Sequence, residues 1–187
     1  MSDDKFYFKL PWALQSRVEI LNMLENDITE SSWSEYHGFN VLPLGTAPML
    51  TSPHLTELHK RHPFKNMGII RMDPYTNYDW HTDGVRGVSL NALISDPMAR
   101  TCCLFRNSHS VTPMRRAHSN FNVTELVYES NAAYLLNVQL DHMVLNLSSK
   151  PRYMFSIEFM EDKTKLTYED LRRESEFAPI LNVTTEK

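Results

Sequence analysis

Three residues in the middle and second half of the chain have the types and spacing of a metal site. His81 and Asp83 are separated by one residue in the segment YDWHTD, and His142 opens the later segment HMVLNL. On an extended strand, side chains two residues apart point to the same face, so we expect the 81 imidazole and the 83 carboxylate to share one cavity. Two histidines and one carboxylate form a set that binds Fe(II) and leaves three positions open. We therefore predict that His81, Asp83 and His142 bind iron.

Arg152 adds an anion-binding group to this set. It enters the strand-like segment RYMFSIEFM, which follows the segment that His142 opens. If the two strands are adjacent, both residues reach one site, and a guanidinium there pairs bidentately with a carboxylate. The open metal positions would then accept a chelating keto acid and dioxygen. Taken alone, each residue also has a simpler interpretation, as an exposed arginine at a strand end or as a hydrogen-bonded histidine of the core or edge.

The order His81-x-Asp83, His142, Arg152 resembles the Fe(II)/2-oxoglutarate-dependent oxygenases, over roughly residues 69–159. The resemblance implies a double-stranded β-helix, or jelly roll, with iron inside one end. It also implies that Arg152 binds the C5 carboxylate of 2-oxoglutarate, the cosubstrate, and that dioxygen is consumed.

Two further runs suggest a branch of that family. Ile70-Arg71-Met72-Asp73-Pro74 and Arg86-Gly87-Val88-Ser89-Leu90-Asn91 look similar to the aspartyl/asparaginyl β-hydroxylases and free-proline hydroxylases, and more loosely to prolyl hydroxylases. This likeness implies a hydroxylase of a C–H bond in an amino acid or a protein residue.

Other side chains are candidates for the cosubstrate pocket. Many relatives carry Ser or Thr two positions after the arginine, where this chain has Met154, and Ser156 is the nearest hydroxyl on the same strand face. Asn91 follows the metal residues on a predicted strand, from which it could face inward. Tyr75 precedes them and, like Tyr78 and Trp80, combines an aromatic body with a polar tip that suits a pocket wall. Core packing is an equal alternative for Trp80.

Hydrophobic patterning predicts a mainly β (α+β) chain that forms an antiparallel sandwich or barrel, and the resemblance implies that this is a cupin-like jelly roll braced by a few helices. Short apolar runs with polar turns between them occupy the core barrel, about residues 67–160, as in antiparallel sandwiches and barrels. Helical spacing of apolar residues predicts a helix over 14–28, and Thr167-Tyr168-Glu169-Asp170 resembles a capping box that opens a last helix. The segment before Lys65 is expected to be irregular apart from one turn near 55–60, and 106–122 to be a surface loop. We expect one domain over 1–187.

Composition narrows the function classes. A net charge of −4 and a pI near 6.0 provide no broad basic field, so nucleic-acid binding is disfavoured and a small molecule, peptide or protein is the expected substrate. The N-terminus does not resemble a secretory signal and no apolar run spans a bilayer, so a cytoplasmic protein is expected. Cys102 and Cys103 would point to opposite faces of a strand, which argues against a disulfide. The alternatives left open are a non-catalytic cupin-like protein, a nucleobase oxygenase and a metal enzyme that needs no 2-oxoglutarate.

Overall fold

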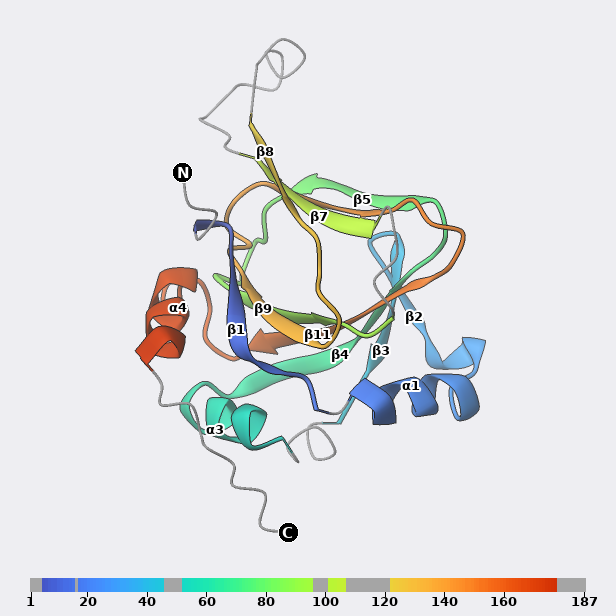
Figure 1. The fold of residues 1–187 in the computed structure, drawn as a ribbon, viewed down its shortest axis with the longest axis horizontal. Coiled ribbons are helices and arrows are strands. Elements are labelled where there is room, and N and C mark those ends of the chain that lie inside the picture. The colour runs from blue at the N-terminus through green and yellow to red at the C-terminus, as the bar shows by residue number, and fades with distance from the viewer. Residues whose placement is uncertain (1–4, 16, 46–51, 96–100, 107–121, 178–187) are drawn as a thin grey trace.

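Two antiparallel β-sheets face each other in the computed structural model, which describes residues 5–15, 17–45, 52–95, 101–106 and 122–177. In Figure 1 the smaller sheet lies above the larger one, and the helices lie below and beside the larger sheet. The larger sheet contains, in spatial order, β1 (Tyr7–Ala13), β9 (Ala132–Leu136), β6 (Ser89–Leu93), β11 (Arg152–Phe159), β4 (Phe64–Met72), β3 (Phe39–Pro43) and β2 (Ser34–Tyr36). The smaller contains β5 (Thr76–His81), β10 (His142–Asn146), β7 (Thr101–Arg106) and β8 (Val123–Leu126).

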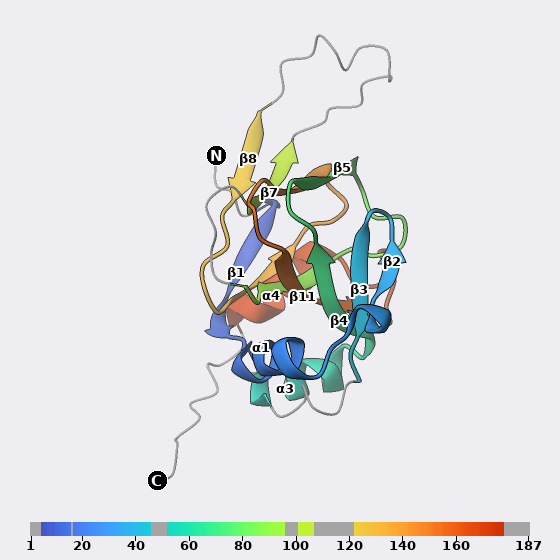
Figure 2. The ribbon, with the colours of Figure 1, turned by 90° about the vertical axis from the view of Figure 1, so that its right-hand side faces the viewer.

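Among the described residues, three α-helices pack against the outer face of the larger sheet, and in both Figure 1 and Figure 2 α1 and α3 lie below it. The helices are α1 (Arg17–Asn26), α3 (Pro53–Arg61) and α4 (Tyr168–Phe177), and a short 3₁₀ helix, η2 (Glu30–Ser32), follows α1. Ile20, Leu55 and Leu171, one from each α-helix, are at most 1% exposed and share a core with strand residues. This outer core fixes the larger sheet against its helices.

Alternation along the strands divides the apolar residues into two cores. On β11, Phe155 and Ile157 pack toward the helices, whereas Met154 belongs to the core between the two sheets. Because side chains two residues apart share a face, Arg152 and Ser156 also face the interior between the sheets. The strand that forms the middle of the larger sheet therefore carries polar groups into the barrel.

The predicted fold class is confirmed, and the last helix begins as expected. Asp170 N–H donates to Thr167 Oγ1 and Thr167 N–H donates to Asp170 Oδ2, each at 3.2 Å, which is the reciprocal pattern of a capping box. Cys102 and Cys103 are free thiols, and both are buried. The predicted first helix is present but shorter, over Arg17–Asn26.

The first third of the chain corrects the prediction of an irregular segment. β2, β3 and a nine-residue α3 occupy the region before Lys65, and β1 precedes the first helix. Their sequences lack the apolar alternation of a half-buried strand, because β2 is exposed throughout and β1 is only partly buried. Most of the predicted 106–122 loop lies outside the described residues. Within the part of the chain that the structure describes, no helix has the length and apolar character needed to cross a membrane.

Candidate metal centre

His81, Asp83 and His142 come together at one end of the barrel. β5 and β10 pair antiparallel with His142 opposite His81, so strand pairing alone brings the two imidazoles close. One ligand atom from each of the three residues lies within 4.8 Å of the others. No other group of three or more potential ligands with this spacing occurs among the described residues.

Asp83 reaches the site by a route that differs from the prediction. β5 ends at His81, so the two residues do not share a face of one continuous strand. The chain instead turns toward the segment after β9, where Asp83 N–H donates to Val138 O at 2.9 Å. The predicted proximity of His81 and Asp83 holds, but the turn and the Val138 bond produce it rather than strand alternation.

Backbone carbonyls set the orientation of both imidazoles. His81 Nδ1 lies 2.6 Å from Asp79 O and His142 Nδ1 lies 3.0 Å from Leu140 O. Because a carbonyl only accepts, each Nδ1 carries the proton and each Nε2 keeps a lone pair for a metal. Burial, with the neighbouring His81, lowers the pKa of His142 to about 4, so this ring is neutral at neutral pH. A neutral imidazole is the form that binds metals.

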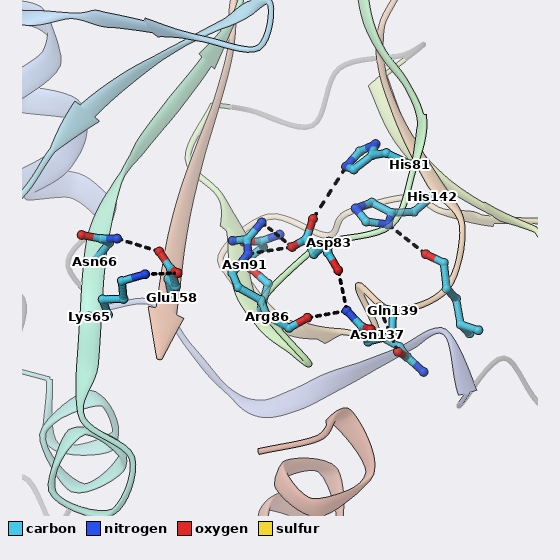
Figure 3. A network of polar contacts seen from close by, with 12 residues as sticks. Lys65, Asn66, His81, Asp83, Arg86, Asn91, Asn137, Gln139, His142 and Glu158 are labelled. Atoms are coloured by element: carbon cyan, nitrogen blue, oxygen red, sulfur yellow. Dashed lines mark hydrogen bonds and ion pairs between the residues drawn. The ribbon is translucent and has the colours of Figure 1, made fainter. Parts of the chain in front are cut away.

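Asp83 divides its two oxygens between different partners, as Figure 3 shows. Arg86 Nε and Nη2 both lie 2.6 Å from Asp83 Oδ2. The other oxygen, Oδ1, lies 3.9 Å from His81 Nε2. Two imidazole nitrogens and one carboxylate oxygen therefore face one another, a donor set of the kind that binds Fe(II).

Arg152 is a buried cation with incomplete hydrogen bonding. It is 3% exposed, its Nη1 lies 3.7 Å from Met72 Sδ, and its Nε has no hydrogen-bond partner. Among the described residues, no carboxylate forms an ion pair with it. A buried charge without a partner is costly, so this guanidinium fits an anionic ligand that would complete its bonds.

Tyr128 completes this polar group and was missed by the sequence analysis. Its hydroxyl hydrogen-bonds to the side chains of Asn91 and Arg152, and the Arg152 guanidinium lies 5.3 Å from the centre of its ring. Burial raises the pKa of Tyr128, so the hydroxyl stays protonated and can donate. The residue lies in the connection between β8 and β9, where no strand pattern signals an inward side chain.

The other residues predicted to line the cosubstrate pocket lie in three different places. The structure places Asn91 beside Tyr128, with Ser89 Oγ donating to Asn91 Oδ1 at 3.1 Å. Ser156 lines the groove described below. The prediction for Tyr75 is wrong, because the residue has a positive φ of 58° in the turn before β5 and its side chain is 70% exposed.

The two aromatic residues nearest to His81 have different surroundings. The ring of Tyr78 lies 4.0 Å from the His81 ring, centre to centre, and Tyr78 lines the groove. Trp80 instead lies under the guanidinium of Arg106, at 4.5 Å. Tyr78 is therefore the pocket residue of this segment.

A groove of about 780 Å³ extends from the metal centre across the larger sheet. Of the three candidate metal ligands, Asp83 lines it, together with Arg86, Tyr78 and Glu158. Its other lining residues come mainly from β2, β3 and β4, and include Tyr36, Phe39, Val41, Pro43, Asn66, Gly68 and Ile70. The groove thus joins the candidate metal centre to a largely apolar and aromatic wall.

Comparison with known proteins identifies the fold. No protein-family model and no curated protein matches this chain. A prolyl hydroxylase from Trichoplax adhaerens, solved with a peptide of hypoxia inducible factor, matches with TM-score 0.62 and 11% identity, over 90% of this chain and 86% of that one. The α-ketoglutarate-dependent epimerase SnoN of nogalamycin biosynthesis matches with TM-score 0.61 and 13% identity, over 85% and 78% of the two chains.

A third structure is HygX from Streptomyces hygroscopicus, solved with nickel, 2-oxoglutarate and hygromycin B. It matches with TM-score 0.57 and 14% identity, over 83% of each chain. This chain has the fold of the Fe(II)/2-oxoglutarate oxygenases. The jelly roll implied by the sequence resemblance is therefore present, with His81, Asp83 and His142 at one end and Arg152 inside it.

Proposed function

We propose that this protein is a Fe(II)- and 2-oxoglutarate-dependent dioxygenase that hydroxylates a C–H bond of an amino acid or of a residue in a peptide or protein. One observation carries the proposal: three metal-binding side chains converge in the same barrel that contains an arginine, Arg152, with no carboxylate partner among the described residues. A non-catalytic barrel needs neither the open metal positions nor the buried cation.

The donor set fits the metal, and the barrel interior fits the cosubstrate. When bound, Fe(II) and 2-oxoglutarate would supply oxidation of a C–H bond by dioxygen, with succinate and carbon dioxide as by-products. His81, Asp83 and His142 would hold the metal. Arg152 would pair with the far carboxylate of the keto acid, and Tyr128 would donate a hydrogen bond to the same group.

The strand registers indicate that the candidate metal ligands and the Arg152–Tyr128 pair lie about one keto-acid length apart. Tyr128 and Arg152 both lie near Cys103, since the Arg152 charge lowers the pKa of Cys103 and Cys103 raises the pKa of Tyr128. Cys103 pairs with Val144, which is two residues from His142 on β10. Two residues along a strand correspond to about 7 Å, which suits a five-carbon dicarboxylate held at both ends.

The groove supports a substrate that is uncharged where it meets the metal centre. Its two cations are already paired, Lys65 with Glu158 at 2.9 Å and Arg86 with Asp83. Asn66 Nδ2 also donates to Glu158, at 2.6 Å. The remaining wall is mainly aromatic and aliphatic, with Ser34, Glu35 and Ser156 as its other polar residues, and the similar prolyl hydroxylase was solved with a peptide. An amino-acid side chain presented by a peptide agrees with both observations.

Anaerobic addition of Fe(II) and then 2-oxoglutarate to metal-free protein tests the proposal directly. We expect the weak visible charge-transfer band of a chelated keto acid, and we expect Arg152→Met to weaken it while iron still binds. Iron binding without a band in the parent protein would indicate an enzyme that needs no keto acid. Absence of iron binding would favour the non-catalytic barrel.

The substrate class has its own test. Succinate release should be stimulated by peptide or amino-acid pools. Stimulation by oligonucleotides alone would overturn the proposed class in favour of a nucleobase oxygenase.

A further inference from the structure

Arg86 makes an unusual contact with a residue of the metal centre. Two of its guanidinium nitrogens, Nε and Nη2, lie 2.6 Å from the same oxygen of Asp83, Oδ2. The second oxygen, Oδ1, faces His81 Nε2 instead. Charge-assisted hydrogen bonds of this length are strong, so Oδ2 is fully engaged by the guanidinium while Oδ1 stays available.

The backbone that carries this pair is fixed from one side by Gln139. Its Nε2 donates both to Asp83 O, at 2.8 Å, and to Arg86 O, at 2.6 Å. Figure 3 shows Gln139 bridging the two carbonyl groups. Asp83 N–H is held as well, by Val138 O. The two ends of the turn therefore keep a constant separation.

The same turn is also fixed by the segment before α4. Lys163 N–H donates to Val85 O at 2.8 Å, and a Cβ added to Gly87 would lie 2.3 Å from Leu166 O. The contact on Gly87 leaves no room for the turn to move toward that segment. Arg86 thus projects from a rigid turn rather than from a freely moving loop, although its side chain is 31% exposed.

We propose that Arg86 is a positioning residue that reserves Oδ2 of Asp83, so that this carboxylate binds the metal through one oxygen only. The inference rests on the proposed function in that it assumes a metal at this centre. A carboxylate that binds through both oxygens occupies two positions and removes one of the three that a chelating keto acid and dioxygen require. Arg86 therefore keeps the third position open.

Removing Arg86 has different expected effects on metal binding and on keto-acid binding. Arg86→Gln frees Oδ2 and also removes a positive charge beside the metal centre, so metal affinity should be retained or increased. Keto-acid affinity should fall by about tenfold, comparable to the smaller losses of metal affinity or activity that follow removal of a residue that orients a metal ligand. Arg86→Lys keeps the charge and one donor, so it should recover part of the loss.

Co(II) is a suitable probe, because its visible spectrum reports coordination number. We would titrate Co(II) into the metal-free parent, Arg86→Gln and Arg86→Lys, and then measure 2-oxoglutarate binding to each loaded protein by calorimetry. Arg71→Gln is the matched control, since it removes an arginine that pairs with a carboxylate, Glu30, away from the metal residues. We expect Arg71→Gln to leave both affinities unchanged.

Selective loss of 2-oxoglutarate binding in Arg86→Gln, with partial recovery in Arg86→Lys and a changed Co(II) spectrum before the keto acid is added, would support the proposal. Equal loss of Co(II) and 2-oxoglutarate binding, with a lower melting temperature, would show a merely structural role and overturn it. Unchanged binding of both would also overturn it. If the parent binds Co(II) but not 2-oxoglutarate, the proposed function fails, while an unchanged Co(II) spectrum in Arg86→Gln would independently refute the role of Arg86.

Discussion

Arg152 allows a prediction in which stability and function change in opposite directions. The guanidinium is 3% exposed, its Nε has no partner, and no carboxylate among the described residues pairs with it. Arg152→Met keeps an unbranched side chain of similar length and removes the charge. Since a buried ion without its counter-ion is expensive, we expect the ligand-free variant to be more stable than the parent, and to lose 2-oxoglutarate binding.

The magnitude follows from two opposing contributions. Replacing buried ionic groups by apolar ones of similar volume stabilises proteins by about 1–4 kcal/mol in favourable cases. The change also removes one hydrogen bond from Tyr128, which keeps Asn91 as a partner, at a cost of about 1 kcal/mol. The difference is a net gain of up to about 3 kcal/mol, which corresponds to a Tm increase of up to about 12 °C for a chain of this length.

Thermal and urea unfolding of the ligand-free proteins measure this gain. Arg106→Met is the matched control, because Arg106 is also buried but both Nε and Nη2 lie 2.8 Å from Asp141 Oδ2. Its removal leaves Asp141 without its partner and should lower the free energy of unfolding. In addition, 2-oxoglutarate with a divalent metal should raise the Tm of the parent more than metal alone, and should not do so in Arg152→Met.

A loss of more than about 1 kcal/mol in ligand-free Arg152→Met would refute the reasoning, because it would mean that the guanidinium is satisfied inside the barrel. Retained 2-oxoglutarate binding in a stabilised variant would refute its role as the anion site while leaving the stability argument intact.

Three further predictions concern the metal, the thiols and the turn at Gly87. Saturating Co(II) should raise the Tm of the parent by about 5 °C or more, and neither a chelator-treated sample nor Asp83→Ala should show this shift. Burial raises the pKa of Cys102 to about 11 and of Cys103 to about 12. At mildly alkaline pH fewer than about one thiol in a hundred is therefore ionised. A thiol reagent should leave the native protein unlabelled and should react only after denaturant is added. Gly87→Ala should lower the free energy of unfolding, measured by urea titration, by about 1–3 kcal/mol, because the new Cβ would meet Leu166 O. Gly84→Ala has open space around the new Cβ and should be nearly neutral. Unshifted melting with metal, rapid native labelling, or equal stability of the two glycine variants would contradict the respective prediction.

The sequence predicted the parts of the fold that apolar alternation or capping chemistry specify. β6 and β9 are almost fully buried runs, β10 and β11 mix buried and half-buried residues, and α4 begins at a reciprocal Thr167–Asp170 pair. β3 escaped prediction because it takes its stability from pairing with β4, a long-range contact, and β2 because it is an exposed edge strand that pairs with β3; neither has a side-chain pattern of its own that indicates a strand. Strand propensity depends strongly on such neighbours.

In the candidate site, too, the residues on patterned strands could be predicted from sequence, and those positioned by long-range contacts could not. His81 and His142 could be predicted because each lies on a strand and their types suggest a ligand set. Tyr128 could not, since it comes from a connection whose path is fixed only when the barrel closes. Tyr75 was misplaced for a related reason: its aromatic type suggested a pocket, but the positive φ of a turn decided its direction. The type of a residue indicates its possible chemistry, whereas backbone direction depends on the assembled sheet.

The pairing of His142 with His81 also determines when a metal can bind during folding. The two imidazoles come from strands far apart in the sequence, and only the β5–β10 register places them together. An unfolded chain offers His81 and Asp83 as a weak pair of neighbours, so tight binding must follow formation of the smaller sheet. Metal loading is therefore expected to be a late event that slows unfolding more than it speeds folding. Cells that lack the metal would accumulate a folded apoprotein ready to be loaded, rather than an unfolded chain.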